Sequence, residues 1–501
     1  MKTLNEKCVK LIELFFLVVA GFVFICLVFA CLKEDIWFDE VFSASFARHS
    51  YSEITSLTAE DVHPPLYYFY LKFTYTLIIS IFHGAKEITV YKIASLFPVL
   101  ATGAYVLYFD REKKAIRYSF IFLLLFMTMP QINSYMIEIR MYSLALFFVT
   151  AAFLHAYGIV TSHKTIHWFF FSLYGILTAY TQYYACVAII GLYIMLFLYL
   201  LKQKEQKKKN VLRWAGCVGI SIAAYIPWLP ALFHQVAKVS DSYWIEPLSL
   251  RSVAGCMKYV FLPVSYDITI DYALAVCMML SCAVSLFFIW KSKMKKEEVF
   301  FVGTGLFIPF FVFAVGLVCS MLNRPIFIYR YLIPALGVFW LSISYTLGKN
   351  VKNRIALILL VPFILGGYFN LKGLYVEENK KQTEMDHTES VLSQIPQDAV
   401  IVSNFDHVQA VTGFYLPNNI FLYENEPEEL ISKLLPNCKT IADDIDIQEE
   451  LKKQPVYFFG SFQVRDDIVK RWEEKGIRVT ELDSCLLERY WFNVYLLEME
   501  K

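Results

Sequence analysis

The sequence is poor in charge. Asp, Glu, Lys and Arg together make up 18% of its 501 residues, whereas 57% of the residues are hydrophobic. A soluble globular enzyme carries about 25% charged residues, so the composition argues against a soluble enzyme. The apolar residues come in long runs rather than in periodic stripes, which predicts a polytopic α-helical membrane protein. With a net charge of +1, the chain also has no basic field that would favour nucleic acid.

Several catalytic and cofactor motifs are absent from the sequence. There is no Walker A motif and no GxGxxG after a strand, so no ATP or dinucleotide site is predicted. HExxH and GxSxG are also missing, which excludes the common signatures of zinc proteases and serine hydrolases. The 11 cysteines form no CxxC pair and no Cys/His cluster with metal spacing. No resident metal site is predicted.

The first apolar run follows a basic start. Lys2, Lys7 and Lys10 precede the run at residues 11–32, which resembles the beginning of a signal peptide. The run is too long for a signal peptide, however, and no cleavage site of small residues follows it. The sequence therefore predicts a retained first span with a cytoplasmic N-terminus.

Short basic loops set the predicted orientation, because Lys/Arg-rich loops stay in the cytoplasm. Four such loops occur later in the chain, at residues 111–117, 202–209, 291–298 and 349–354. All four fall inside if spans lie at 118–132, 142–161, 167–181, 184–201, 212–231, 272–290, 299–322, 331–347 and 354–370. Segments 64–82 and 88–109 are both apolar, but only one net crossing fits between the outside loop at 33–63 and the inside loop at 111–117. The sequence does not decide which segment crosses. The total is about eleven spans.

The composition changes after residue 370. Charge rises, and short β-rich runs alternate with helical patterns, which predicts a small α/β domain over residues 371–501. About 130 residues are enough to bury a core. The predicted organisation is a membrane domain over 1–370, with its first outside loop at 33–63, followed by an extracytoplasmic domain.

Two adjacent carboxylates, Asp39 and Glu40, follow the first span directly. Carboxylates beside hydrocarbon are costly to maintain, so they suggest a function. One of them could act as a general base that takes a proton from an acceptor hydroxyl or amine, while its neighbour orients it. The alternative is an acidic pair that only marks an outside loop.

Cationic side chains gather in the predicted outside segments. His63 precedes two prolines, and it could face a lipid phosphate or belong only to a stiff loop-to-helix corner. Arg140 is placed to bind a phosphate with two hydrogen bonds. The alternatives are that its side chain only reaches to the membrane interface or pairs with Glu138. Arg324 and Arg330 lie in one predicted outside turn, although Lys and Arg are normally enriched in cytoplasmic loops. An anionic phosphate is their natural partner, and lipid headgroups in general are the alternative.

The aromatic stretch around Gln182-Tyr183-Tyr184 is also predicted to lie outside. Tyrosines there could line a sugar pocket, but an aromatic belt at the membrane interface is the favoured interpretation. Nucleotide sugars are found inside the cell, whereas the acids and arginines cluster outside. A sugar donor on that face would be carried by a polyprenyl phosphate in the membrane.

Taken in order, these segments resemble the GT-C superfamily of glycosyltransferases that use lipid-phosphate sugars. The closest resemblance is to bacterial members of the family 39/83 type, related to protein O-mannosyltransferases and lipid A aminoarabinose transferases. Segment 371–501 matches no family motif, but it resembles the outside α/β domains that cap some members. The motifs are Trp37-Phe38-Asp39-Glu40, His63-Pro64-Pro65-Leu66-Tyr67, the set Glu138, Arg140, Tyr142 and Leu144, and Arg330-Tyr331-Leu332-Ile333-Pro334.

The resemblance implies a GT-C-like bundle and a single inverting displacement at the anomeric carbon of the donor. It implies that Asp39 is the catalytic base with Glu40 beside it. Where relatives have Lys in place of His63 they carry a permanent cation, whereas an ordinary histidine is only partly charged. A divalent cation stays open, since some GT-C enzymes use one and others none. The residues implied to bind the lipid-linked donor and its phosphate are His63, Arg140, Tyr142, Arg324, Arg330 and Tyr331.

Other functions make different predictions. A transporter or flippase of lipid-linked glycans predicts ionisable residues at mid-membrane depth and pseudo-repeated halves, and the sequence shows neither. An assembly protein would not need about eleven spans as an anchor. A polymerase or ligase of lipid-linked oligosaccharides stays open within the enzymes. The predicted partners are the membrane, the polyprenyl-phosphate donor and an acceptor that is a lipid, a protein or a cell-wall glycan.

Overall fold

The computed structural model describes residues 6–33, 35–110, 116–241, 249–322, 325–349, 351–425, 429–441 and 443–499. Contacts divide the chain into two compact units. The helical unit comprises Met1–Leu32, Thr58–Ala85 and Val90–Tyr375, and the α/β unit comprises Lys33–Leu57, Lys86–Thr89 and Val376–Lys501. Each unit is built from segments that are far apart in the sequence.

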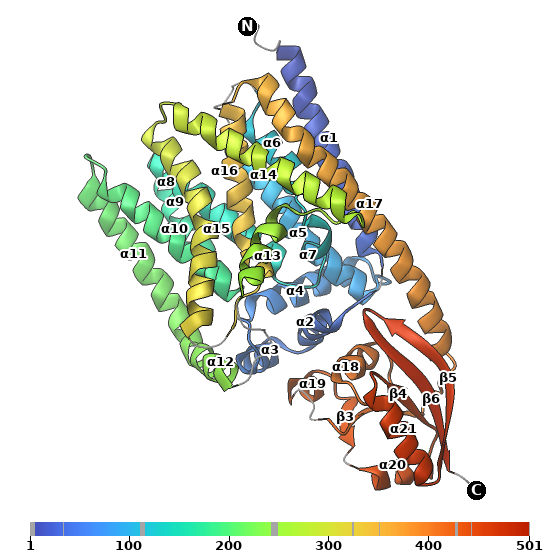
Figure 1. Cartoon of the computed structure of the whole chain (residues 1–501). Helices are drawn as coiled ribbons and strands as arrows, with labels where there is room; N and C mark the ends of the chain where they lie inside the picture. The colour runs from blue at the N-terminus through green and yellow to red at the C-terminus, as the bar shows by residue number, and fades with distance from the viewer. Residues whose placement is uncertain are drawn as a thin grey trace. The chain divides into compact units, whose positions relative to one another are not determined.

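The helical unit consists of long apolar helices and shorter connecting ones (Figure 1). Within the described residues, nine helices are long and apolar enough to span a membrane. This confirms a multi-pass α-helical membrane protein, while the number of about eleven spans stays a prediction. The helices are α1 (Glu6–Cys31), α4 (Leu66–Ile81), α5 (Glu87–Phe109), α6 (Tyr118–Thr128), α7 (Ile132–Tyr135), α8 (Tyr142–Ser162), α9 (Thr165–Ala179), α10 (Tyr183–Leu201), α11 (Lys207–Tyr225), η1 (Ile226–Trp228), α12 (Leu229–Asp241), α13 (Leu250–Phe261), α14 (Ile268–Lys291), α15 (Lys296–Leu322), η2 (Tyr329–Leu332) and α16 (Ile333–Lys349).

The two apolar segments between which the sequence did not decide differ in length. Helix α4 has 16 residues, whereas α5 has 23 and qualifies as a candidate span. A 16-residue helix is about 24 Å long, which is shorter than the roughly 30 Å of a bilayer's apolar core. By length and composition, α5 is therefore the better candidate for the crossing.

Helices α8 and α16 form the interior of the helical unit. In the most apolar part of the candidate span Tyr329–Lys349, which contains α16, 89% of the residues are buried, and the corresponding value for α8 is 78%. Gly337 lets the two helices approach closely, because a Cβ added there would lie 2.2 Å from the Thr150 hydroxyl oxygen. Gly305 plays the same part between α15 and α16, against Ser342. Small residues at such crossings are typical of helix packing in membranes.

Helix α17 (Asn353–Leu392) is a single helix of 40 residues with Pro362 inside it. The sequence predicted a span that ends at residue 370 and an α/β domain that begins at 371. The helix instead continues to Leu392, so its first part belongs to the helical unit and the remainder to the α/β unit.

A six-stranded sheet in the order β3-β2-β1-β4-β6-β5 lies in the α/β unit. The first four of these strands pair in parallel, and β6 pairs antiparallel with both β4 and β5. The predicted small α/β domain is confirmed. The strands are β1 (Val400–Ser403), β2 (Ile420–Tyr423), β3 (Cys438–Ile441), β4 (Val456–Gly460), β5 (Ile477–Leu487) and β6 (Tyr490–Met499), and the helices are α18 (Asp406–Tyr415), α19 (Glu429–Leu434), α20 (Asp444–Leu451) and α21 (Val464–Glu474).

The apolar core of this unit lies between the sheet and its helices. Phe458 of β4 packs edge-on against Trp472 of α21, with ring centroids 4.8 Å apart, and stacks on Tyr495 of β6 at 5.8 Å. The β-rich runs expected from the sequence were 399–403, 420–423, 456–460, 478–480 and 494–497, so strand β3 was not among them. Two of its four residues, Lys439 and Thr440, are exposed. An edge strand this short gives no alternating apolar signal.

Residues 33–57 belong to the α/β unit by contact. This segment contains α2 (Phe38–Arg48) and the first part of α3 (Tyr51–Glu60), and α2 packs against α18 and α19. Arg48 of α2 lies 4.0 Å above the Phe414 ring of α18 and forms an ion pair with Glu87. The contact units therefore do not coincide with the ranges 1–370 and 371–501, which were drawn from composition.

Candidate functional site

The two carboxylates of the first outside loop have different surroundings. Both lie in the first turn of α2, which begins immediately after Trp37. The Glu40 side chain is buried, and its Oε2 accepts a hydrogen bond of 3.2 Å from the backbone N–H of Trp37. This is the reciprocal half of a capping box, which satisfies an otherwise orphaned backbone donor. Glu40 therefore has a structural task, and Asp39, which is partly exposed, is the better candidate base.

Aromatic side chains of the α/β unit surround this turn. The Phe38 ring centroid lies 3.8 Å from that of His407, and the His407 ring lies 5.2 Å from Tyr490. Burial lowers the pKa of His407, although the nearby charges of Asp406 and Asp39 oppose this effect. The imidazole is therefore mainly neutral near pH 7.

The turn between β5 and β6 supports the same loop. Glu488 and Arg489 have φ angles of 47° and 79°, a left-handed conformation that is costly for residues other than glycine. The turn places the Arg489 guanidinium 4.8 Å above the ring of Trp37. Strain of this kind persists only where surrounding contacts hold it, and the contact with Trp37 is one of them.

A buried charged cluster lies in the helical unit around His63. Its Nδ1 is 3.4 Å from Oδ2 of Asp61, and both side chains are mostly buried. Arg140 is only 6% exposed. Burial alone would raise the pKa of Asp61, but the hydrogen bond and charge of His63, the Val62 N–H and the charge of Arg140 outweigh it and lower the pKa. Asp61 is therefore ionised at neutral pH.

Asp61 is a site residue that the sequence reasoning missed. It stands two positions before His63, in a loop that was treated only as the approach to the prolines. The available signal was an acid close to a candidate cation, directly before a fixed corner. Its carboxylate also accepts a hydrogen bond of 3.5 Å from the Tyr68 hydroxyl of α4.

Charged residues from the motif that contains Arg140 and from the motif that contains Arg330 lie near the same tyrosine. The charges of Glu138 and Arg330 both act on Tyr135 of α7. The ring of Tyr135 also lies 5.5 Å from that of Tyr142 and 5.7 Å from that of Tyr259. The motifs that contain Arg140 and Arg330 are far apart in the sequence, but both lie near the same group of aromatic side chains.

Residues 180–184, at the start of α10, interact both with the segment that follows His63 and with Tyr331. The Leu66 N–H, just after the two prolines, donates to the Tyr180 carbonyl at 3.1 Å. The charge of Asp61 acts on Tyr183, whose hydroxyl donates to Gln235. Tyr184 stacks on Tyr331 with ring centroids 4.8 Å apart and planes tilted by 16°.

The predicted donor-binding residues of the helical unit are thus linked through α10 and Tyr135, with one exception. Arg324 lies outside the described residues. Among the described residues, no group of three or more His, Cys, Asp or Glu side chains is arranged to hold a metal ion. We assign no residue to a divalent cation.

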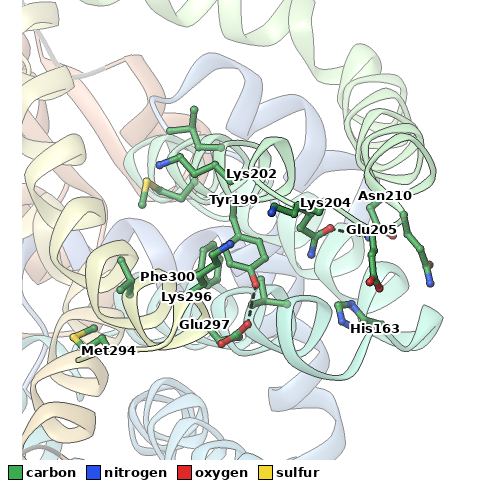
Figure 2. Close-up of a pocket in the computed structure, with 16 residues that line it drawn as sticks. His163, Tyr199, Lys202, Lys204, Glu205, Asn210, Met294, Lys296, Glu297 and Phe300 are labelled. Carbon is green, nitrogen blue, oxygen red and sulfur yellow. Dashed lines mark hydrogen bonds between the residues drawn. The ribbon is translucent and has the colours of Figure 1, made fainter. Parts of the chain in front are cut away.

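A pocket of about 750 Å³ lies at the ends of α8, α10 and α15 and the start of α11 (Figure 2). Lys202, Lys204 and Lys296 line it together with Glu205 and Glu297, and the Tyr199 hydroxyl donates to Glu297 at 3.3 Å. The lysines and Glu205 are exposed. None of the predicted site residues lines this pocket, and its nearly balanced charge does not single out a ligand.

The helical unit is a bundle of long apolar helices, and the α/β unit is a small mixed sheet with helices. The chain is a multi-pass membrane protein.

The comparisons with solved structures support the GT-C fold. The chain matches the crystal structure of ArnT from Cupriavidus metallidurans in the apo state with a TM-score of 0.59, and the same protein bound to undecaprenyl phosphate with a TM-score of 0.61. In both cases the identity is 11%, and the match covers 97% of each chain. At this identity the similarity shows the fold alone.

Another match is the arabinofuranosyltransferase AftD from Mycobacteria, with 11% identity and a TM-score of 0.49. It covers 100% of this chain but only 40% of AftD, and a TM-score this low supports no argument. No family model and no curated protein sequence matches the chain. The predicted GT-C-like fold is thus confirmed by similarity of structure.

Proposed function

We propose that this protein transfers a sugar from a polyprenyl-phosphate-linked donor to an acceptor on the outer face of the membrane. The main support is a fold shared along 97% of both chains with ArnT, a protein whose structure was solved with bound undecaprenyl phosphate. The second support is the buried cluster of His63 and Arg140 around the ionised Asp61. Cationic side chains held in place in this way can stabilise the negative charge that develops on a leaving phosphate.

The proposed reaction is a single displacement with inversion at the anomeric carbon. An acceptor hydroxyl or amine attacks this carbon, and Asp39 takes its proton. The bond between the anomeric carbon and the phosphate oxygen breaks, and the lipid phosphate leaves with the electron pair. His63, Arg140 and Arg330 stabilise the charge that develops on the leaving phosphate, which is the part of the barrier that preorganised cations lower most.

Glu40 has a different role in this mechanism. Because its carboxylate caps α2, it fixes the turn that carries Asp39 and takes no proton itself. Tyr142 and Tyr331 line the donor site beside the arginines. Arg324 belongs to the proposed donor site on sequence grounds.

The experiment that tests this function is a comparison of surface glycans. Mass spectrometry of lipids, proteins and cell-wall polymers in a deletion strain is expected to show the loss of one sugar modification, which the unmodified gene restores. The polyprenyl-phosphate-linked donor should accumulate in the deletion strain. An unchanged set of surface glycans, together with lipid-linked glycans trapped on the cytoplasmic face, would instead support a flippase.

We also propose that the N-terminus is cytoplasmic and that the C-terminal domain lies outside, since this places the basic loops inside. Alkaline phosphatase fused after residue 499 is then expected to be active, and the same enzyme fused within residues 202–209 should be inactive. The control is green fluorescent protein at the same two positions, which should give the opposite pattern. Active phosphatase in the 202–209 loop would overturn the orientation.

A further inference from the structure

Gln182, at the start of α10, has a side chain that the protein does not satisfy. It is only 2% exposed, and neither its amide nitrogen nor its amide oxygen has a hydrogen-bond partner among the residues that the structure describes. It occupies the N-cap position of α10, yet its side chain does not cap the helix. Leaving a buried polar group unsatisfied costs about 1–3 kcal/mol, and native proteins rarely accept this without a reason.

The neighbours of Gln182 use their polar groups within the protein. The hydroxyl of Tyr183 donates to Gln235 and accepts from the Trp228 indole N–H at 3.1 Å. The hydroxyl of Tyr184 donates to the carbonyl of Ile326 at 3.4 Å. Among the described residues of this turn, the amide of Gln182 alone has both a donor and an acceptor without a hydrogen-bond partner.

The position of Gln182 places it between the parts of the proposed donor site. Two residues before it, the Tyr180 carbonyl accepts from Leu66 in the His63 corner. One residue after it, Tyr183 interacts electrostatically with the Asp61 carboxylate. Two residues after it, Tyr184 stacks on Tyr331, next to Arg330.

The chemistry of the amide narrows the class of ligand. A carboxamide offers two N–H donors and one carbonyl acceptor. A phosphate diester only accepts hydrogen bonds, so it would leave the amide oxygen unsatisfied. A sugar hydroxyl both donates and accepts, and two neighbouring hydroxyls can satisfy both ends of the amide.

We propose that Gln182 binds hydroxyl groups of the sugar that the donor carries, and so contributes to the choice of sugar. This inference rests on the proposed function. It also revises the sequence interpretation of this segment: Tyr183 and Tyr184 are held by protein contacts, and the residue that meets the ligand is the glutamine before them.

The test replaces Gln182 by methionine, which has a similar length and volume but no hydrogen-bonding amide. Removing an unsatisfied polar group should leave the thermal midpoint of the purified protein unchanged or raise it. The matched control is Gln235→Met. Gln235 is equally buried, but its amide donates to the Thr58 carbonyl at 2.7 Å and accepts from Tyr183, so this variant should melt at a lower temperature.

The binding readout uses two probes, undecaprenyl phosphate and the polyprenyl-linked sugar fraction extracted from the deletion strain. For Gln182→Met we expect unchanged affinity for undecaprenyl phosphate and an affinity for the sugar-bearing fraction that is about 5- to 20-fold weaker, in keeping with one or two neutral hydrogen bonds. Gln182→Asn, which keeps the amide with a shorter reach, should be affected less.

The outcomes separate this inference from the proposed function. If the unmodified protein binds neither probe, both proposals fail. If it binds both and Gln182→Met binds the sugar-bearing fraction as well as before, the amide is satisfied by water and only the inference about Gln182 fails. A fall in thermal midpoint like that of Gln235→Met, or failure to fold, would assign the amide a structural role and likewise overturn it.

Discussion

Replacing Asp39 by asparagine is expected to reduce sugar transfer at least 100-fold while the protein is still made and inserted into the membrane. General base catalysis contributes about 10²- to 10⁴-fold to an enzymatic rate, and asparagine has no basic oxygen that could take the proton. Asp39 is partly exposed in the first turn of α2, and asparagine has nearly the same size and shape, so the substitution removes the charge with little change in packing. In the deletion strain, the Asp39→Asn gene should fail to restore the missing surface sugar.

The adjacent carboxylate provides a matched control for this experiment. Glu40→Gln keeps an oxygen that can accept from the Trp37 N–H, and glutamine is an accepted residue at this position of a capping box. We therefore expect Glu40→Gln to restore the glycan nearly as well as the unmodified gene. Full restoration by Asp39→Asn would remove the catalytic assignment, and loss of activity in Glu40→Gln alone would transfer it to the neighbour.

The second large effect is expected at Arg140. Arg140→Ala should bind undecaprenyl phosphate roughly 10- to 100-fold more weakly, because a hydrogen bond to a charged group contributes about 1.5–3 kcal/mol. Arg140→Lys keeps the charge but lacks the planar fork that binds two phosphate oxygens, so its affinity should be intermediate. The measurement is a titration of the purified variants with undecaprenyl phosphate in detergent.

The control for Arg140 is Arg251→Ala. Arg251 lies between the predicted spans 212–231 and 272–290, on the side of the membrane opposite the basic loops. Its side chain is exposed on α13, so its loss should change the affinity little. Arg140 also contributes to keeping Asp61 ionised, and the thermal midpoint of each variant must therefore be measured in parallel. Equal affinity in a folded Arg140→Ala protein would return this arginine to an ordinary interfacial role.

The sequence predicted the parts of this protein that depend on local composition. Long apolar runs identify membrane helices because hydrocarbon excludes backbone and side-chain polarity over about 20 residues at a time. Alternating strand and helix patterns identified the α/β domain for the same local reason. Strand β3 was not predicted, because an edge strand of four residues with two exposed side chains shows almost no alternation of apolar and polar residues.

The candidate site was harder to predict, because its meaning lies in contacts between distant residues. Asp39 and Glu40 look equivalent in sequence, and the roles proposed for them differ because Glu40 is buried and accepts a hydrogen bond from the Trp37 N–H. Asp61 gained significance only from its contact with His63 and the nearby charge of Arg140. Gln182 became conspicuous through what it lacks within the described chain, and no sequence pattern reports an unsatisfied amide.

The grouping of residues 33–57 with the C-terminal sheet has a consequence for exchanging domains between related proteins. Trp37 and Phe38 lie against Arg489 and His407, so a chimera that imports a foreign C-terminal half would have to import the matching first loop as well. Inactivity of a chimera, or of a chain shortened after α17, would not show that the sheet domain selects the acceptor. The same inactivity would result if residues 33–57 lost the contacts with the C-terminal sheet that hold them in place. Residues 33–57 and the sheet domain should therefore be exchanged together.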